Sequence, residues 1–146
     1  MPTSPESHLR TQLLASAAVS ALIGTRLEPE ASSEATILPR IIYSRQSSDR
    51  SGYMGGGSGL LFLRIQFDIF AKLKTDLENV ADAVRNRIDG FRGTITTGSD
   101  TLRFFLVRLE EELDQAVTPT DGSDQIVFHR VLDFFVSCQE TVPTLT

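Results

Sequence analysis

Cysteine and histidine are scarce in this sequence, and each shortage excludes a class of site. The single cysteine, Cys138, cannot form an internal disulfide or build a cysteine-based zinc site. Its place near the end of a predicted strand suits a small buried hydrophobic residue. The two histidines, His8 and His129, have no motif around them that supplies a nucleophile, a base and an orienting group. We therefore predict no catalytic site, no bound cofactor and no enzymatic activity, and a surface or interface position for His129.

Long apolar runs are missing as well. The opening residues, MPTSPESHLRTQLL, lack a basic stretch followed by an extended apolar core, so we expect no signal peptide. No run of apolar residues approaches the roughly 20 needed to span a bilayer. These observations predict a soluble protein without a membrane partner, made in the cytoplasm.

Positive charge is limited and almost entirely arginine. The formal net charge is −5, which argues against a protein whose main task is to neutralise DNA phosphates. Lys72 and Lys74 are the only lysines. Arginine pairs with carboxylates through two parallel hydrogen bonds and is favoured at interfaces, although a GC-rich genome explains the bias equally well.

Two segments have the periodicity of helices. The 146 residues, 40% of them hydrophobic, suffice for one domain over residues 1–146. The first predicted helix runs from an N-cap at Ser4 to a stop at Gly24. The second spans residues 75–90, with a Thr75–Glu78 capping box and Gly90 as a left-handed cap.

A glycine cluster at residues 55–59 precedes an apolar run and raises the possibility of a phosphate-binding loop. Such a loop needs a helix N-terminus after its glycines. Here a strict two-residue period follows from Leu61 to Ile69, with Arg64, Gln66 and Asp68 on the other face. This pattern predicts a strand with one buried face. Residues 48–59 are therefore interpreted as a long, flexible arm that joins this strand to an earlier strand at 37–47.

Three more strands complete the predicted fold. A hairpin turning at Thr97-Gly98-Ser99-Asp100 has a long second arm that ends in Glu110, Glu111 and Glu112. A last strand follows at 125–138, and residues 139–146 form a tail without a core pattern. The fold class is thus α+β, an antiparallel or mixed sheet of about five strands with two helices packed on it, in the order α-β-β-α-β-β-β.

The charged segments have alternative interpretations. Asp114, Asp121 and Asp124 lack the ligand spacing of a calcium-binding loop, and a polar turn explains them. The candidates for contacts between copies or with partners lie on the arm, on the polar strand face and around the acidic strand end. They are Arg50, Tyr53, Met54, Arg64, Gln66, Asp68, Glu110, Glu111, Glu112 and Asp121.

Several segments, in order along nearly the whole chain, carry a family resemblance. They are ALIGTRLEP, LPRIIYSR, GGGSGLLFLRIQFDIFA, VADAVRNRIDGFRGT and TDGSDQIVFHRVLDFFV. Together they resemble the tail completion, or tail terminator, proteins of long-tailed bacteriophages and gene transfer agents. The sequence departs at Phe128-His129-Arg130, where relatives often carry tyrosine before the arginine.

The resemblance implies a six-fold ring on the head-proximal end of the tail tube. Such a ring stops tube growth, contacts the major tail tube protein and the head-completion or neck protein, and lets DNA pass through its bore without specific binding. It also implies assembly in the bacterial cytoplasm and a final place in the virion tail or neck. The acidic residues Glu110–Glu112 could then form one of two complementary ring contacts, or line the bore.

Two other interpretations stay open. The chain could be a neck or minor tail protein of similar fold at another axial position. It could also be a cytosolic, dimeric small-molecule-binding α+β module. The sequence does not distinguish a phage from a gene transfer agent.

Overall fold

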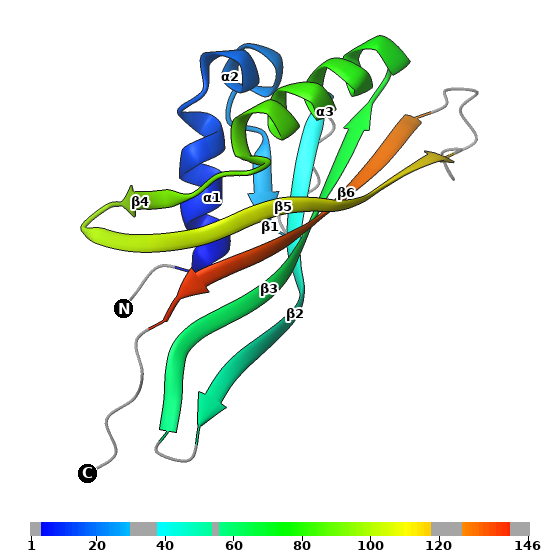
Figure 1. The fold of residues 1–146 in the computed structure, drawn as a ribbon. Helices are drawn as coiled ribbons and strands as arrows, with labels where there is room; N and C mark the ends of the chain where they lie inside the picture. The colour runs from blue at the N-terminus through cyan, green and yellow to red at the C-terminus, as the bar shows by residue number, and fades with distance from the viewer. Residues whose placement is uncertain (1–3, 30–37, 54–55, 118–126, 141–146) are drawn as a thin grey trace.

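The computed structural model describes residues 4–29, 38–53, 56–117 and 127–140 (Figure 1). Its helices are α1 (Pro5–Leu14), α2 (Ala17–Ile23) and α3 (Lys74–Ile88). Its strands are β1 (Leu27–Pro29), β2 (Arg40–Tyr53), β3 (Gly56–Ala71), β4 (Gly93–Thr97), β5 (Asp100–Val117) and β6 (Val127–Gln139).

In the described residues the strands form one mixed sheet in the order β1-β2-β3-β6-β5-β4. β1 pairs parallel to β2, and all other neighbours are antiparallel. The α+β class is confirmed, and each of the five predicted strands has a counterpart among β2 to β6, whereas the numbers of strands and helices differ from the prediction. The additional strand, β1, is only three residues long and ends in Pro29. It forms because Leu27 lies beside Ile41 in the core, a contact that sequence periodicity does not reveal.

The first predicted helix is two helices. Ser4 caps α1 by accepting a hydrogen bond from the Ser7 amide, as expected, but α1 ends at Leu14. Ser16 then caps α2, and the Ser20 hydroxyl donates to the carbonyl of Leu14 at 2.7 Å. Side-chain hydrogen bonds of this kind compete with the helical backbone pattern and explain the break.

The second predicted helix forms, but its start differs from the prediction. α3 begins at Lys74 after Leu73, which makes no side-chain cap, so Thr75 lies inside the helix and the predicted capping box does not form. Its end agrees better, because Gly90 follows with the left-handed φ of 82°. The hairpin between β4 and β5 turns at Gly98, whose φ of 63° is also left-handed.

The glycine-rich arm is the largest correction to secondary structure. Where a connection at 48–59 was predicted, β2 continues to Tyr53 and β3 begins at Gly56, with Tyr53 opposite Gly56. Register shifts at Arg45/Ser47 and Arg50/Gly52 mark bulges along β2. The alternating residues of β3 pair with β2, and this pairing continues into the glycines at the start of β3. The glycine backbone tolerates the bulges that occur there.

One face of the sheet is buried by the helices. The predicted alternation of β3 is confirmed, because Leu61, Leu63, Ile65, Phe67 and Ile69 are all buried. They form one core with Leu9 and Leu13 of α1, Val19 and Ile23 of α2, and the apolar stripe of α3. All three helices therefore cover the same face, and the opposite face of the sheet carries no described helix (Figure 1).

Candidate assembly surfaces

The uncovered sheet face, called the open face below, carries a row of polar residues along its centre. Arg64, Gln66 and Asp68 alternate with the buried residues of β3 and lie on this face. Arg64 donates a hydrogen bond from Nη2 to Asp133 Oδ2 at 2.6 Å, and this bond raises the pKa of Arg64. Gln66 Nε2 donates to Asp68 Oδ1 at 2.7 Å. The three predicted residues are thus brought together, with Asp133 as a partner.

Aromatic rings flank this polar row at both ends. Phe62 stacks on Phe135 at 5.9 Å between centroids, and the Arg108 guanidinium lies 5.7 Å from the Phe135 ring. At the other end Phe70 stacks on His129 at 4.3 Å. Arginine and aromatic side chains together are typical of contact surfaces between proteins.

His129 is a half-buried member of the open face. Its Nε2 lies 3.4 Å from Asp68 Oδ1, and its side chain is 13% exposed. His129 Nε2 and Asp133 Oδ1 are both buried without a hydrogen-bond partner among the described residues. Unpaired buried polar atoms are uncommon, so this face is less well satisfied than the core.

The end of the β2–β3 hairpin lies away from the helices (Figure 1). Its predicted residue Arg50 donates to both carboxylate oxygens of Glu140, at 2.7 and 2.9 Å, and this pairing raises the pKa of Arg50. Tyr53 is the last residue of β2. Met54 lies outside the described residues.

The acidic end of β5 is divided between the two sheet faces. A register shift between Leu109 and Glu111 marks a bulge, after which Glu111 lies opposite Asp133 and Glu112 opposite Leu132. Glu111 is therefore on the open face and Glu112 on the helix-covered side. Glu110 accepts a hydrogen bond from Arg108. Asp121, also predicted, lies outside the described residues.

Arg130 organises the helix-covered side of this acidic end. It donates to Asp114 Oδ1 at 2.5 Å and Oδ2 at 2.9 Å, and its Nη1 lies 3.2 Å from Glu112 Oε1. The hydrogen bond from Arg130 lowers the pKa of Asp114. Glu110, Glu111 and Glu112 thus form no single patch.

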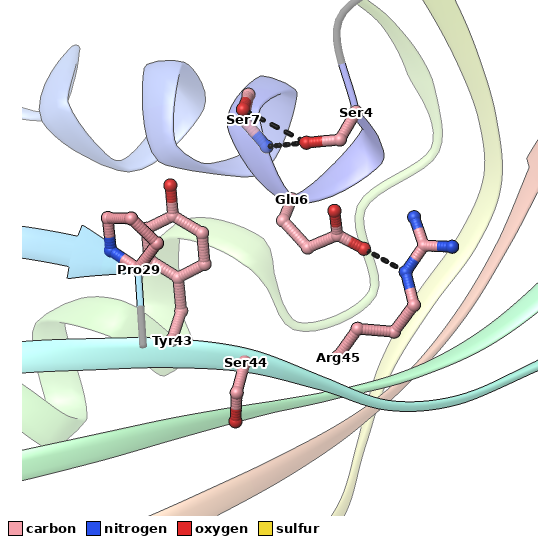
Figure 2. A pocket seen from close by; sticks show the side chains of 7 residues that line it. All are labelled: Ser4, Glu6, Ser7, Pro29, Tyr43, Ser44 and Arg45. Atoms are coloured by element: carbon pink, nitrogen blue, oxygen red, sulfur yellow. Dashed lines mark hydrogen bonds and ion pairs between the residues drawn. The ribbon is translucent and has the colours of Figure 1, made fainter. Parts of the chain in front are cut away.

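One shallow hollow lies between α1 and β2 (Figure 2). Its volume is about 310 Å³, and it is lined by Ser4, Glu6, Ser7, Pro29, Tyr43, Ser44 and Arg45. Figure 2 shows Glu6 pointing to Arg45, and the two form an ion pair in which Arg45 Nε lies 2.5 Å from Glu6 Oε1. Ligand pockets are usually enclosed and mainly apolar, whereas this hollow is open and largely polar.

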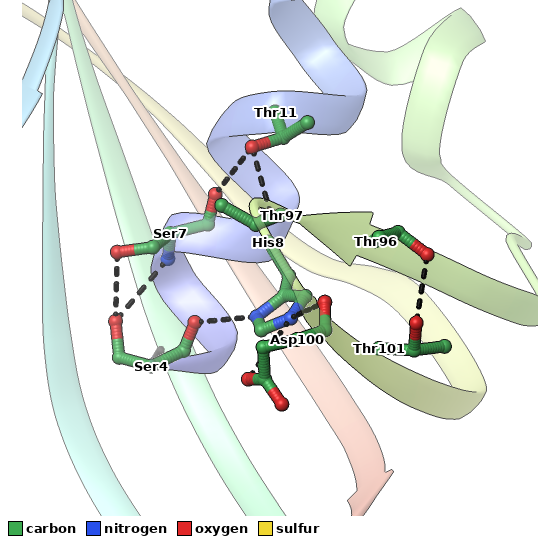
Figure 3. Close-up of polar contacts among 8 residues, drawn as sticks. All are labelled: Ser4, Ser7, His8, Thr11, Thr96, Thr97, Asp100 and Thr101. Carbon is green, nitrogen blue, oxygen red and sulfur yellow. Dashed lines mark hydrogen bonds and ion pairs between the residues drawn. The ribbon is translucent and has the colours of Figure 1, made fainter. Parts of the chain in front are cut away.

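The other histidine, His8, ties α1 to the β4–β5 hairpin (Figure 3). Its side chain is fully buried, with Nδ1 2.9 Å from the Ser4 carbonyl oxygen and Nε2 3.3 Å from that of Asp100. Thr97 strengthens the same junction by donating to the Thr11 hydroxyl at 2.9 Å. This arrangement holds two elements together and leaves His8 out of contact with solvent.

The predicted nature of Cys138 is confirmed. Its side chain is buried, and desolvation raises the pKa of its thiol to about 12. A thiol of this kind is a poor nucleophile at neutral pH. Within the described ranges, no group of three or more His, Cys, Asp or Glu side chains could hold a metal ion. No helix in the same ranges is long and apolar enough to cross a membrane.

Some residues of these surfaces were missed by sequence reasoning. They are Phe62, Arg108, Asp133 and Phe135. The alternation of β6 could have identified Asp133 and Phe135, because they alternate with Phe134 and Val136 of the buried face. Arg108 gives no such signal, because its side of the sheet depends on bulges in β5.

Comparison with known proteins is consistent with this architecture. Residues 7–134 match the family described as tail completion protein gp17. The chain is also similar to a chain in a solved structure described as "Virion of native gene transfer agent (GTA) particle", with a TM-score of 0.72 and 14% sequence identity. That match covers 93% of this chain and 95% of the other, and at this identity it shows a shared fold. No curated protein matches this chain. Since the family match extends from the first helix into the last strand, the chain belongs to the tail completion protein gp17 family.

Proposed function

We propose that this tail completion protein is a structural component of a phage-type virion that caps the tail tube at its head-proximal end. In this role it forms a closed ring, stops addition of tube subunits and presents a surface to the neck proteins. The family match over residues 7–134 is the observation that carries the proposal. The likeness to a chain of a gene transfer agent virion agrees with it.

The surfaces of the protein suit assembly better than chemistry. A ring of identical subunits needs two different, complementary patches on each subunit. The open face, with its aromatic rings and its Arg64–Asp133 pair, offers one extended contact surface for a tube or neck protein. The histidines are engaged in contacts and the cysteine is buried, so we infer a non-enzymatic role.

Deletion of the gene tests the proposed position along the tail. A missing tube cap should leave tails of uncontrolled length, seen by negative-stain electron microscopy. Complementation with the wild-type gene is the control. Normal tails that fail to join heads would instead indicate a neck protein, and would contradict tube termination.

Purification tests the ring. Native mass spectrometry of the chain, alone and mixed with its tube protein, should give a single closed oligomer, for which six copies are expected. A stable monomer under both conditions would contradict the ring, and a compact dimer with a bound metabolite would favour a small-molecule-binding module.

A further inference from the structure

Two stretches of the sheet lose the alternation of buried and exposed residues. In β2 every residue from Arg45 to Arg50 is exposed, and in β5 every residue from Glu110 to Gln115 is exposed. From Leu61 to Ala71 of β3 and from Leu132 to Val136 of β6, by contrast, buried residues alternate with less buried ones. In the two exposed stretches the described residues cover neither face, although both stretches belong to strands of the sheet.

Both stretches also have an outer edge that pairs with no strand among the described residues. β1 pairs with β2 only from Ile41 to Tyr43, and β4 pairs with β5 only up to Phe104. The turn after α3 extends this cover, because Val107 donates to the Phe91 carbonyl and the Leu109 amide donates to Asp89. Beyond Tyr43 on one side and Leu109 on the other, no described strand pairs with the sheet. Unpaired strand edges are templates for another strand.

We propose that the outer edge of β5 in one copy pairs with the outer edge of β2 in the next copy. The β5 edge is defined as Glu110–Val117 and the β2 edge as residues 44–53. This inference rests on the ring proposed above and names its contact. A β5-to-β2 contact is head-to-tail, so it uses two different patches and can close into a ring.

Charge favours this pairing over the symmetric alternative. The β5 edge carries Glu110, Glu111, Glu112 and Asp114, so two such edges side by side would oppose like charges. The β2 edge instead carries two arginines, Arg45 and Arg50, and one carboxylate, Asp49. Both arginines lie opposite residues of the buried face of β3, so they point to the same side of the sheet as Glu112 and Asp114.

These charged residues have partners within their own chain, but those pairs leave room for exchange. Arg45 binds Glu6 and Arg50 binds Glu140, and the Arg50 side chain is 56% exposed. Exposed ion pairs contribute little free energy to stability. A carboxylate from the neighbouring copy can therefore bind Arg50 beside Glu140, or in its place, at small cost. Leu113 lies in the middle of the β5 edge and is 49% exposed, which supplies an apolar contact.

The strand directions agree with the proposal. Each of β2, β3, β6 and β5 is antiparallel to the next, so β2 and β5 run in opposite directions. Rotation about the ring axis preserves the sense in which each strand runs along that axis. The β5 edge of one copy therefore meets the β2 edge of the next as an antiparallel pair, the slightly more stable arrangement.

The two edges lie at opposite ends of the sheet, and a closed ring needs such an offset. Through the strand register, Leu113 is level with Ile42, whereas Asp49 at the centre of the β2 edge is level with Leu106. Asp49 and Leu113 both lie on the open face, and bringing them opposite each other requires a shift of about 20 Å along the strands over a width of about 19 Å for four strands. The resulting tilt of about 45° is at the upper end of the range typical of closed barrels.

Charges and bulges on an edge are also the usual means of preventing strand pairing. Site-specific cross-linking distinguishes an edge that pairs with the next copy from an edge that is protected against pairing. The variants Asp49→Cys and Leu113→Cys each place one thiol on the open face at an exposed edge, and Asn86→Cys places one on the exposed side of α3 as a matched control. The native Cys138 does not interfere, because it is buried with a thiol pKa of about 12.

Two single variants are mixed and allowed to assemble into rings, which are then treated with a short bismaleimide. The products are separated under denaturing conditions. We expect covalent dimers when Asp49→Cys is mixed with Leu113→Cys, and none from Leu113→Cys alone or from Asn86→Cys mixed with Leu113→Cys. The Asp49→Cys/Leu113→Cys double variant should give a ladder that ends at the ring size. In the wild-type ring both edges should also exchange amide hydrogens more slowly than in the monomer.

The outcomes separate this inference from the ring itself. Rings that form normally without the mixed cross-link, or that cross-link Leu113→Cys to itself, would overturn the strand pairing and leave the ring intact. Cross-linking of these edges only to the tube protein would also overturn it, since the occupant would then be another chain. A wild-type chain that never oligomerises would overturn the ring, and this contact with it.

Discussion

The two faces of the sheet differ most clearly at two neighbouring residues of β6. Phe134 is fully buried under the helices and packs edge-on against Phe67 at 5.6 Å. Phe135 lies on the open face, stacks on Phe62 and is approached by Arg108. Where the helices cover it, the first face consists almost entirely of apolar side chains, whereas the second mixes aromatic rings with ion pairs. One face has the composition of a core and the other that of a contact surface.

Phe134→Ala should give the largest effect, on stability. Truncating a fully buried phenylalanine removes its packing and leaves a cavity, at a cost of about 3–5 kcal/mol. Urea unfolding followed by circular dichroism measures the loss. A loss below about 1 kcal/mol would show that the helix-covered face is not the core of the isolated chain.

Phe135→Ala is the matched control one residue away. Its ring is half-buried, so we expect a smaller loss than for Phe134→Ala, of which the aromatic pair accounts for about 0.5–1.5 kcal/mol. If the open face contacts the tube or the neck, particle assembly should fall although the monomer stays folded. Counting complete particles by electron microscopy checks this, and normal assembly would remove the open face from the candidate contacts.

The acidic end of β5 should respond to charge rather than to packing. Replacing Glu110, Glu111 and Glu112 by Gln should leave the fold intact, weaken ring assembly and reduce its dependence on salt. Mass photometry at several salt concentrations measures the ring fraction. The control makes the same charge change on α3 with Asp76→Asn, Glu78→Gln and Asp82→Asn. Unchanged assembly and unchanged DNA delivery would argue against any role for the three glutamates.

The smallest effect is expected at Asp114, where the pKa is lowered by the hydrogen bond from Arg130. A lowered carboxylate pKa adds stability above the ordinary value of 3.8, and this stability is lost as the pH falls through the lowered pKa. Because the Asp114 side chain is 50% exposed, solvent screening keeps the contribution below about 1 kcal/mol. Asp114→Asn should therefore reduce stability slightly at pH 7 and reduce it less at pH 2. Urea unfolding at both values measures this, and equal losses would contradict the assignment.

The sequence predicted the features that depend on a local period. The alternation from Leu61 to Ile69, the buried Cys138 and the turn at Gly98 follow from short-range patterns, and all are found in the structure. The break at Ser16 was missed because the apolar period continues across it. A single serine in the sequence is only a weak sign that its side chain will cap a new helix.

Features that depend on distant contacts were not predicted. β1 exists because Leu27 meets Ile41, and the glycines of the arm become strand because β2 lies beside them. The acidic run of β5 was recognised, but which glutamate lies on which face depends on the bulge at Glu110. A bulge depends on how two strands pair, so it cannot be predicted from the sequence of either strand alone.

That bulge makes chain length, rather than residue type, the sensitive variable in β5. Glu110 is the extra residue between Leu109 and Glu111, which pair with the consecutive residues Phe134 and Asp133. Deleting Glu110 should therefore leave every other strand pair in place and only relax the local bend and twist. Since the curvature of each protomer determines the angle at which the next one docks, loss of a single residue could change the number of protomers needed to complete the circle.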